Sequence, residues 1–377
     1  MECEGCLLGF LGCSERSFGR YLGDILQLLE NLWYCAALKD EVSAKPMRRV
    51  ICGMPMVFYQ TEAGEPVALE DRCSHRHAPL SLGNVIDDEI HCLYHGYVFD
   101  RTGSCTHIPH QKGASANAAI RSFPIVERWG LLWVWWGDSA ESDRALIPDL
   151  SWTEAPDKRP IYIYFYVNAN HQLVADNLLD VSHADYLHSS TFGSNSGKKG
   201  GVQPDSMTME TTTSDGKVNS YRKLENVTVG PLARKWGGFT KELDRVNTQM
   251  WEPPNIIHVQ LELMNDENHI CLNHDHIMTP ETDKTTHYFM DATRDFGVEN
   301  VGYPTDEDIY NEHYSVISGE DIPMIEAQQA NIDLYDSLRD VPAKADRLVD
   351  DVHRLLRDLY ANANLTLPPE VRRTGPV

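Results

Sequence analysis

The chain has 377 residues, of which 42% are hydrophobic and 24% charged, the composition of a folded globular protein. This length excludes a small disulfide-held scaffold and allows one large core or two ordinary ones. The 33 Lys and Arg residues against 56 Asp and Glu residues give a net charge of −23, which disfavours binding to nucleic acid or to an anionic membrane.

The amino-terminal residues, 1–30, are predicted to form an extension before the first domain. Its apolar segment at 6–13 is too short to cross a bilayer and follows Glu2 and Glu4, so we expect neither export nor a membrane span. Apolar residues at helical spacing predict an amphipathic helix over 17–33. The nine cysteines, an odd number spread along the chain, suit a reducing cytoplasm.

Residues 31–145 are predicted to form a compact, all-β domain, because short β-branched and aromatic runs alternate with Gly, Pro and Asp turns. A connection rich in proline and charge, over 140–160, leads into a second domain assigned to 146–377.

The second domain mixes strand and helix patterns, which predicts an α+β fold. Its first strand, over 161–167, carries tyrosines on one face and is predicted to be buried on both faces. A helix over 169–188 and an irregular loop over 189–216 follow. The remaining predicted elements are strands near 218–229, 256–264, 269–279 and 285–292 and helices over 306–338 and 342–362.

Two Cys-His pairs lie in the β domain: Cys73 with His75, and Cys92 with His95. A zinc site is an alternative, but structural zinc usually uses other spacings. A [2Fe–2S] cluster with two cysteines on one iron and two histidines on the other fits better, and its imidazoles raise the potential. His77 and His91 are rival ligands that the spacing disfavours, and Cys105 is interpreted as a packing residue.

A second set of metal-ligating types lies on the helix after the tyrosine strand. Asn177, Asp180 and His183 are three residues apart, so the carboxylate of Asp180 can accept a hydrogen bond from His183. His183 and His188 are about 140° apart on an ideal helix, so they share a metal only if the helix ends or bulges there. Two imidazoles and one carboxylate leave open positions on Fe(II), as in oxygen-activating iron enzymes; the alternative is a pair of core histidines.

The two motifs in this order resemble the catalytic component of Rieske non-haem iron oxygenases, in the branch of vanillate and dicamba O-demethylases and aromatic N-dealkylases. The segments 121–128, 276–282 and 294–297 have close counterparts there. The resemblance implies a Rieske [2Fe–2S] domain followed by a helix-grip (START-like) catalytic domain with an antiparallel sheet.

The resemblance also supplies the third iron ligand. In these relatives it is an Asp before an acidic helix that contains Ala and Gln, which matches Asp321, after Glu320 and before 325–329. The alternative role of Asp321 is a helix N-cap. Asp185 is the local rival, but it points away from His183 on a helix.

Several roles are implied by the resemblance alone. A ferredoxin and/or flavin reductase supplies electrons from NAD(P)H, and O2 is the co-substrate. The chain forms a homotrimer in which Asp180 bridges its own His183 and His95 of the partner subunit, while Asn177 lies near the iron. The chain itself shows no Gly-x-Gly-x-x-Gly motif after a strand, so the nicotinamide and flavin belong to separate proteins.

The implied reaction hydroxylates an alkyl C–H bond of a small aromatic substrate, and the product loses an aldehyde. His276 and, more weakly, His258 are candidate substrate contacts, although either can equally be a structural strand histidine. Glu312 stands where benzoate-binding relatives carry a tryptophan, which favours a neutral aromatic ether or N-alkyl anilide over a carboxylate. The alternatives are a ring-hydroxylating dioxygenase and a non-catalytic Rieske electron-transfer protein.

Overall fold

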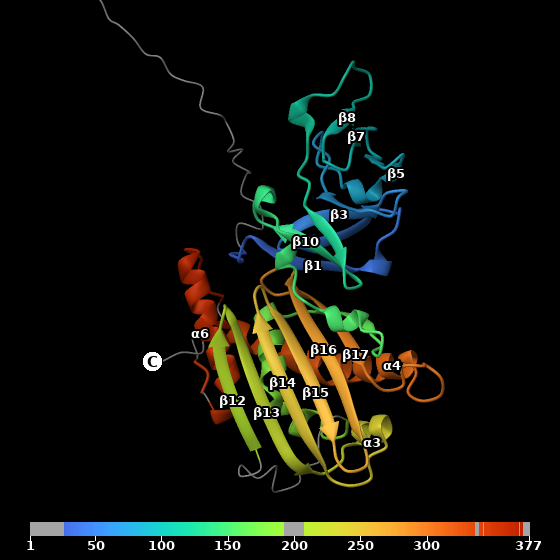
Figure 1. The fold of residues 1–377 in the computed structure, drawn as a ribbon. Helices are drawn as coiled ribbons and strands as arrows, with labels where there is room; N and C mark the ends of the chain where they lie inside the picture. The colour runs from blue at the N-terminus through green and yellow to red at the C-terminus, as the bar shows by residue number, and fades with distance from the viewer. Residues whose placement is uncertain (1–25, 192–206, 336–338, 342, 369, 372–377) are drawn as a thin grey trace, which may run out of the picture.

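The computed structural model describes residues 26–191, 207–335, 339–341, 343–368 and 370–371, and Figure 1 shows two domains stacked end to end. The cysteines at 3, 6 and 13 lie outside the described residues, as does most of the helix predicted over 17–33. The carboxyl end of that prediction is wrong, because residues 26–31 form no helix and lead into a strand. Leu28 and Leu29 are buried in two different hydrophobic clusters, so tertiary packing overrides their helical spacing.

The N-terminal domain is all β, as predicted. Its three sheets have the strand orders β1-β10-β9, β2-β3-β4 and β5-β6-β7-β8. The strands are β1 Leu32–Leu38, β2 Met47–Ile51, β3 Met54–Gln60, β4 Pro66–Glu70, β5 Asn84–Ile86, β6 Glu89–His91, β7 Val98–Phe99, β8 Cys105–His107, β9 Ile125–Arg128 and β10 Leu131–Trp136. The sheet of β5 to β8 forms the end of the domain that is far from the C-terminal domain (Figure 1).

The C-terminal domain is built on one antiparallel sheet of seven strands in the order β11-β17-β16-β15-β14-β13-β12. Its strands are β11 Tyr162–Val167, β12 Met207–Ser214, β13 Lys217–Val227, β14 Leu243–Glu252, β15 Ile256–Met264, β16 His269–Pro280 and β17 Thr286–Arg294. The strands predicted near 218–229, 256–264, 269–279 and 285–292 are confirmed as β13, β15, β16 and β17. Two others were missed: β14, and β12, which falls inside the predicted loop over 189–216.

Helices cover one face of this sheet. They are α1 His171–Leu179, α2 Ala184–Leu187, α3 Pro231–Gly237, α4 Asp306–Val316, α5 Ile322–Leu334 and α6 Arg347–Asn362. α1 contacts β15, β16 and α5, and α6 packs on β12 and β13 at the sheet edge. The main hydrophobic core lies between these helices and the side chains that alternate strands direct toward them. Among the described residues, no helix has both the length and the apolar character needed to span a bilayer.

The opposite face of the sheet holds the N-terminal domain. Trp33, Trp133 and Trp135 of the N-terminal domain join Ile277 and Phe289 of the sheet in one buried cluster. Main-chain bonds reinforce the contact, since the N–H groups of residues 52 and 53 donate to the carbonyls of residues 280 and 281 at 2.8 and 2.9 Å. The tyrosines of β11 face this interface but are not fully buried, and Tyr166 is 44% exposed, so the predicted two-sided burial is wrong at this edge of the interface.

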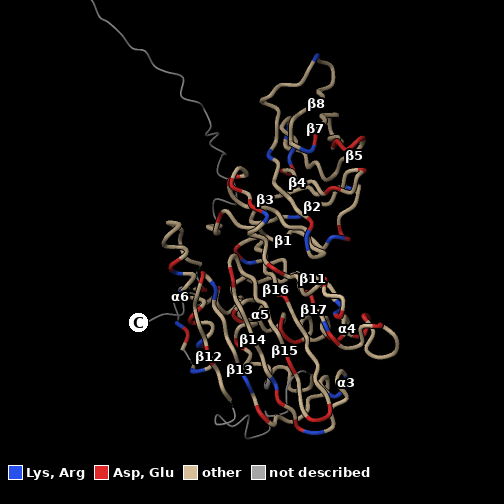
Figure 2. Tube along the Cα trace, viewed as in Figure 1, with Lys and Arg blue, Asp and Glu red and all other residues tan. Residues whose placement is uncertain are grey.

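Lys and Arg residues alternate along the trace with Asp and Glu residues in the described parts of both domains (Figure 2). This distribution agrees with the sequence-based argument against a nucleic-acid surface, which usually needs basic residues gathered on one face.

A buried polar cluster surrounds His258 on the outer face of the sheet, which is the face opposite the helices. Its Nδ1 donates to Asp275 at 2.5 Å and its Nε2 donates to Glu252 at 2.8 Å. Trp152, from the connection between the domains, donates to the other oxygen of Asp275 at 2.7 Å. Burial opposes the charged imidazole, but the two carboxylates outweigh it and raise the pKa of His258 to about 9.

This raised pKa predicts a pH-dependent stability. The contribution of a group whose pKa rises on folding is complete below about pH 6.5 and is lost as pH climbs through about 9, up to about 3 kcal/mol. We therefore expect the free energy of unfolding, measured in urea by tryptophan fluorescence, to fall from pH 6.5 to 9. The fall should be much smaller in His258→Gln, whereas His269→Gln, at an exposed pair with Glu262, should keep the wild-type slope. Equal slopes in wild type and His258→Gln contradict the assignment.

Candidate metal centres and substrate cavity

Three candidate ligands from two distant segments converge in the C-terminal domain. One nitrogen each of His183 and His188 and one carboxylate oxygen of Asp321 all lie within 4.8 Å of one another. Asp321 Oδ1 is 3.2 Å from His188 Nε2 and 3.5 Å from His183 Nε2. The structure thus brings together the three residues predicted to bind one metal.

The backbone between the two histidines is not a continuous helix. α1 ends at Leu179, and Asp180 leaves the helical region at φ −89° and ψ 84°. A 3-10 turn over Val181–His183 then leads into α2, and His188 caps the end of α2. The break places the two imidazole rings 5.1 Å apart, which confirms that the helix must end for both to reach one metal.

Asp321 is brought to the site by a second irregularity, a π-helix over Ile317–Asp321 between α4 and α5. The wider turn changes the direction in which side chains leave the helix, and such turns often occur at functional sites. The predicted helix over 306–338 is therefore divided in three. Asp321 makes no side-chain cap bond to α5, so its alternative role as an N-cap is not seen.

The two imidazoles are oriented by different acceptors. His183 Nδ1 donates to the main-chain carbonyl of Asp180 at 2.5 Å, and His188 Nδ1 donates to Glu320 Oε2 at 2.6 Å. The expectation that the Asp180 carboxylate accepts from His183 is wrong, because that carboxylate accepts from the N–H of Ser182 at 2.9 Å instead. Glu320 was not predicted from the sequence as a partner of His188. The one feature that could have indicated this role is that Glu320 directly precedes Asp321.

The donor set fits a divalent metal such as Fe(II). With both Nδ1 atoms donating, both Nε2 atoms can present lone pairs toward Asp321. Asp321 Oδ1 is fully buried and accepts no hydrogen bond from the described residues. Burial raises the pKa of Asp321, but favourable interactions with His183 and His188 in their protonated forms outweigh it and lower the pKa to about 2, so the carboxylate is ionised. A bound metal ion would take the place of those imidazole protons. Two imidazoles and one carboxylate form the facial set used by non-haem iron.

The second predicted ligand set lies in two similar loops of the N-terminal domain. In each loop the cysteine carbonyl accepts from the N–H four residues on, which belongs to His77 in one loop and Gly96 in the other. Both of these residues have positive φ, 59° and 72°, which makes the turns tight. His77 is thus a turn residue that contacts Arg72, and His91 belongs to β6.

The loops bring the four predicted cluster residues together. Cys73 and Cys92 are buried, whereas His75 and His95 are exposed, with ring centroids 4.6 Å apart. Burial, and then the neighbouring Cys92 thiol, raises the pKa of Cys73 to about 11. Two adjacent buried thiols and two adjacent imidazoles fit a [2Fe–2S] cluster, since iron would replace the thiol protons.

A cavity of about 140 Å³ lies beside the three iron-ligand candidates, between the sheet and the helices. Asn177, expected near the iron, and His276, a candidate substrate contact, both line this cavity. His258 does not line it, because β15 directs this side chain to the outer face, where Asp275 and Glu252 hold it. The structure therefore gives His258 a structural place instead of a substrate contact. The side chain of Asp185 is outside what the structure describes.

Glu312 also lies outside the cavity, which removes the sequence-based argument against a carboxylate substrate. Its carboxylate accepts from Trp236 Nε1 at 2.7 Å, Lys235 Nζ at 2.9 Å and the Tyr303 hydroxyl at 3.0 Å. The next residue, His313, lines the cavity instead.

Comparisons with known proteins agree with this architecture. Residues 32–124 match the Rieske [2Fe-2S] domain, and residues 167–362 match the vanillate O-demethylase oxygenase C-terminal domain. A putative toluene-4-sulfonate monooxygenase iron-sulfur subunit from Comamonas testosteroni is 36% identical over 89% of this chain and 98% of its own length. The dicamba O-demethylase oxygenase component from Stenotrophomonas maltophilia is 36% identical over 73% of this chain and 81% of its own.

A solved structure shows the same fold. Dicamba monooxygenase with non-haem iron and dicamba superposes with a TM-score of 0.76 at 29% identity, covering 90% of this chain and 99% of that one. The sheet and helices around the cavity are therefore shared with dicamba monooxygenase, whose structure contains non-haem iron.

Glu320 provides a test of the iron site. Because a carboxylate partner orients a metal-bound histidine and makes it more basic, Glu320→Gln should weaken mononuclear iron binding by about 10-fold to 100-fold. The measurement is iron per acid-labile sulfide after dialysis against graded chelator. Glu307→Gln, an exposed change on α4, should retain iron like wild type. Equal iron retention in Glu320→Gln and wild type would remove Glu320 from the site.

Proposed function

Because this chain belongs to the vanillate O-demethylase family of Rieske oxygenase components, we propose that it hydroxylates an O- or N-alkyl group of a small aromatic molecule held in the cavity. The hydroxylated carbon then leaves as an aldehyde, and a phenol or an amine remains. The observation that supports this most is the convergence of His183, His188 and Asp321 within 4.8 Å beside that cavity.

The chain is the oxygenase component of a multicomponent Rieske monooxygenase, so a separate reductase or ferredoxin delivers its electrons. We propose that NAD(P)H is oxidised only by that separate protein. Each turnover takes two electrons, two protons and one O2, inserting one oxygen atom into the C–H bond and releasing the other as water.

We propose Cys73, His75, Cys92 and His95 as the ligands of the Rieske cluster. His183, His188 and Asp321 are the proposed ligands of a mononuclear Fe(II), which supplies O2 activation when bound. Around that site Leu261, Val259 and Met290 provide an apolar wall that excludes water and holds an aromatic ring. Asn177 faces the same cavity, where its amide can contact O2 or water near the iron.

The cluster end of the N-terminal domain lies far from the C-terminal domain of its own chain (Figure 1). Beside the exposed His95 there are two exposed apolar side chains, Leu93 at 68% and Tyr94 at 64%, and the Tyr94 ring lies 3.8 Å from the His95 ring. Apolar side chains gathered around a redox site favour docking to another protein surface.

We propose that this surface meets the Asp180 region of the partner subunit in a head-to-tail homotrimer, a closed heterologous ring. In this arrangement the half-buried Asp180 carboxylate contacts His95 of the partner subunit, while its own carbonyl orients His183. Asp180 then links the cluster of one subunit to the iron of the next.

The proposed function predicts both metal content and product. Anaerobically purified protein should contain three irons and two acid-labile sulfides per chain, because one iron adds to a [2Fe–2S] cluster. With a reductase, aryl methyl ethers or N-alkyl anilides should yield one aldehyde per NAD(P)H consumed. Aromatic diols without aldehyde would favour a ring-hydroxylating dioxygenase. Two irons that Fe(II) addition does not raise to three would favour an electron carrier.

Asp180 gives a second prediction. Asp180→Asn keeps an acceptor for the Ser182 N–H, so the local turn should persist, but it loses the charge. We expect both metal centres to be retained while steady-state turnover falls by about 100-fold or more. Iron and sulfide analysis alongside turnover tests this. Loss of the mononuclear iron in this variant would contradict the bridging role.

A further inference from the structure

Three histidines form one wall of the cavity: His274 and His276 on β16, and His313 on α4. All three are buried. Burial lowers the pKa of His276 and of His313 to about 4 and holds the pKa of His274 well below its usual value. Each imidazole is therefore neutral at pH 7 and carries one proton, on one of its two nitrogens.

The contacts decide which nitrogen of His313 and His274 carries that proton. His313 Nδ1 lies 2.7 Å from the carbonyl of Ile309, which can only accept, so Nδ1 is protonated. His313 Nε2 is then a lone pair, and it accepts from His274 Nε2 at 3.0 Å. This bond fixes the proton of His274 on Nε2 and leaves its Nδ1 as a hydrogen-bond acceptor.

The tautomer of His276 follows from Tyr288. The Tyr288 hydroxyl lies 2.6 Å from His276 Nδ1, and its other contact is the Met290 sulfur at 4.0 Å, a poor acceptor. The hydroxyl therefore donates to His276 Nδ1, and His276 carries its proton on Nε2.

The two remaining nitrogens face the cavity. His274 Nδ1 and His276 Nε2 have no hydrogen-bond partner among the described residues. Neither nitrogen is completely buried, however, so each can be reached from the cavity. Both side chains line the cavity, with ring centroids 5.6 Å apart on one face of β16. The wall thus presents one acceptor beside one donor.

We propose that this histidine pair selects an aromatic substrate bearing a neutral carboxamide. The amide N–H donates to His274 Nδ1, and the amide oxygen accepts from His276 Nε2. A carboxylate would place a negative oxygen against the lone pair of His274, an unpaired contact in a buried site. This inference rests on the proposed function and names its substrate class.

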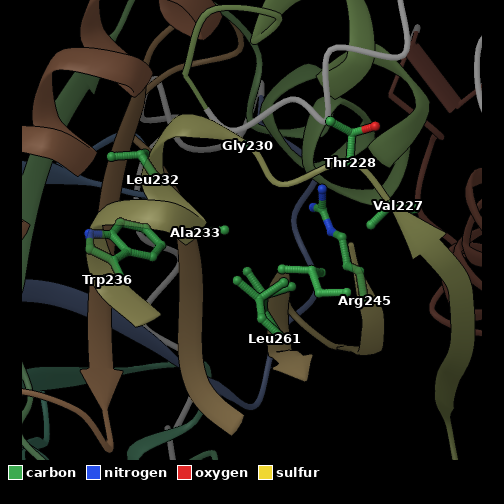
Figure 3. Close-up of a pocket in the computed structure, with 10 residues that line it drawn as sticks. Val227, Thr228, Gly230, Leu232, Ala233, Trp236, Arg245 and Leu261 are labelled. Carbon is green, nitrogen blue, oxygen red and sulfur yellow. The ribbon is translucent and has the colours of Figure 1, made fainter. Parts of the chain in front are cut away.

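Arg245, which also lines the cavity, is remote from this pair. In the sheet register Arg245 pairs with Leu263, and Leu263 pairs with Ile270 of β16. Ile270 precedes His274 by four residues, a distance of about 13 Å along the strand. Arg245 Nε donates to Asn247 at 3.0 Å. Figure 3 shows its guanidinium directed toward Thr228, in a neighbouring cavity that Arg245 and Trp236 also line. A carboxylate held at the histidine pair is thus not paired with Arg245.

The test compares two ligands of nearly equal shape, 3-methoxybenzamide and 3-methoxybenzoate. Their binding to the iron-loaded full chain is measured by calorimetry without O2, so turnover is not required. Wild type should bind the amide at least about tenfold more tightly than the carboxylate. In His313→Leu, His274 loses its acceptor and can move its proton to Nδ1, so the ratio of the two dissociation constants should shift about tenfold toward the carboxylate.

His269→Leu, at the exposed start of the same strand, is the matched control and should keep the wild-type ratio. The inference is overturned if wild type binds the carboxylate as tightly as the amide, if neither ligand binds, or if folded His313→Leu keeps the ratio. Because the wild-type ratio is itself decisive, the test does not depend on the variant folding. Aldehyde release from other aryl ethers by a protein that fails this test would leave the proposed function intact.

Discussion

The meeting of three ligand atoms within 4.8 Å is the constraint that shapes the C-terminal domain. His188 and Asp321 are separated by 133 positions in the sequence, and neither lies in a regular α-helical turn. α1 stops at Leu179 so that His183 and His188 can face one point, and the helix that carries Asp321 widens into a π-turn. These two local irregularities are useful only if the segments that contain them are held at a fixed separation.

A buried amide provides that fixed separation. Gln329 of α5 accepts from the N–H of Asn170, the N-cap of α1, at 2.9 Å, and Asn170 in turn caps α1 by accepting from the Gln172 N–H at 2.8 Å. Because Gln329 is only 5% exposed, breaking this link would leave buried polar groups without partners. From the other side, His353 of α6 donates to Asp176 of α1 at 2.8 Å. The helices beside the iron site are thus joined by polar contacts as well as by the apolar core, which suits a site that needs precise ligand positions.

Local motifs made much of the site predictable, and contacts between distant segments account for most of what was missed. The Cys-His pairs and the two helix histidines are close in sequence, so their spacing reveals them, and even the helix break follows from the five-residue interval. Asp321 could be chosen only through the family resemblance, because a lone carboxylate has no local signature. Glu320 and His313 were missed because their partners, His188 and His274, are 132 and 39 positions away. The edge strand β12 was mistaken for a loop because most of its residues are exposed, so its alternation carries little hydrophobic signal.

Strand β16 shows how one segment serves two opposite electrostatic requirements. Its outward Asp275 belongs to a charged cluster with His258 and Glu252, while its inward His274 and His276 are kept neutral by burial. The neutrality suits the neighbouring iron site. Fe(II) with Asp321 as a ligand and Glu320 bonded to His188 would have no net charge, since two carboxylates balance the metal. A further anion in the same enclosed space would add a negative charge that nothing balances, and a protonated histidine would add an unbalanced positive charge. Because the imidazoles are neutral, the cavity is best suited to an uncharged arene.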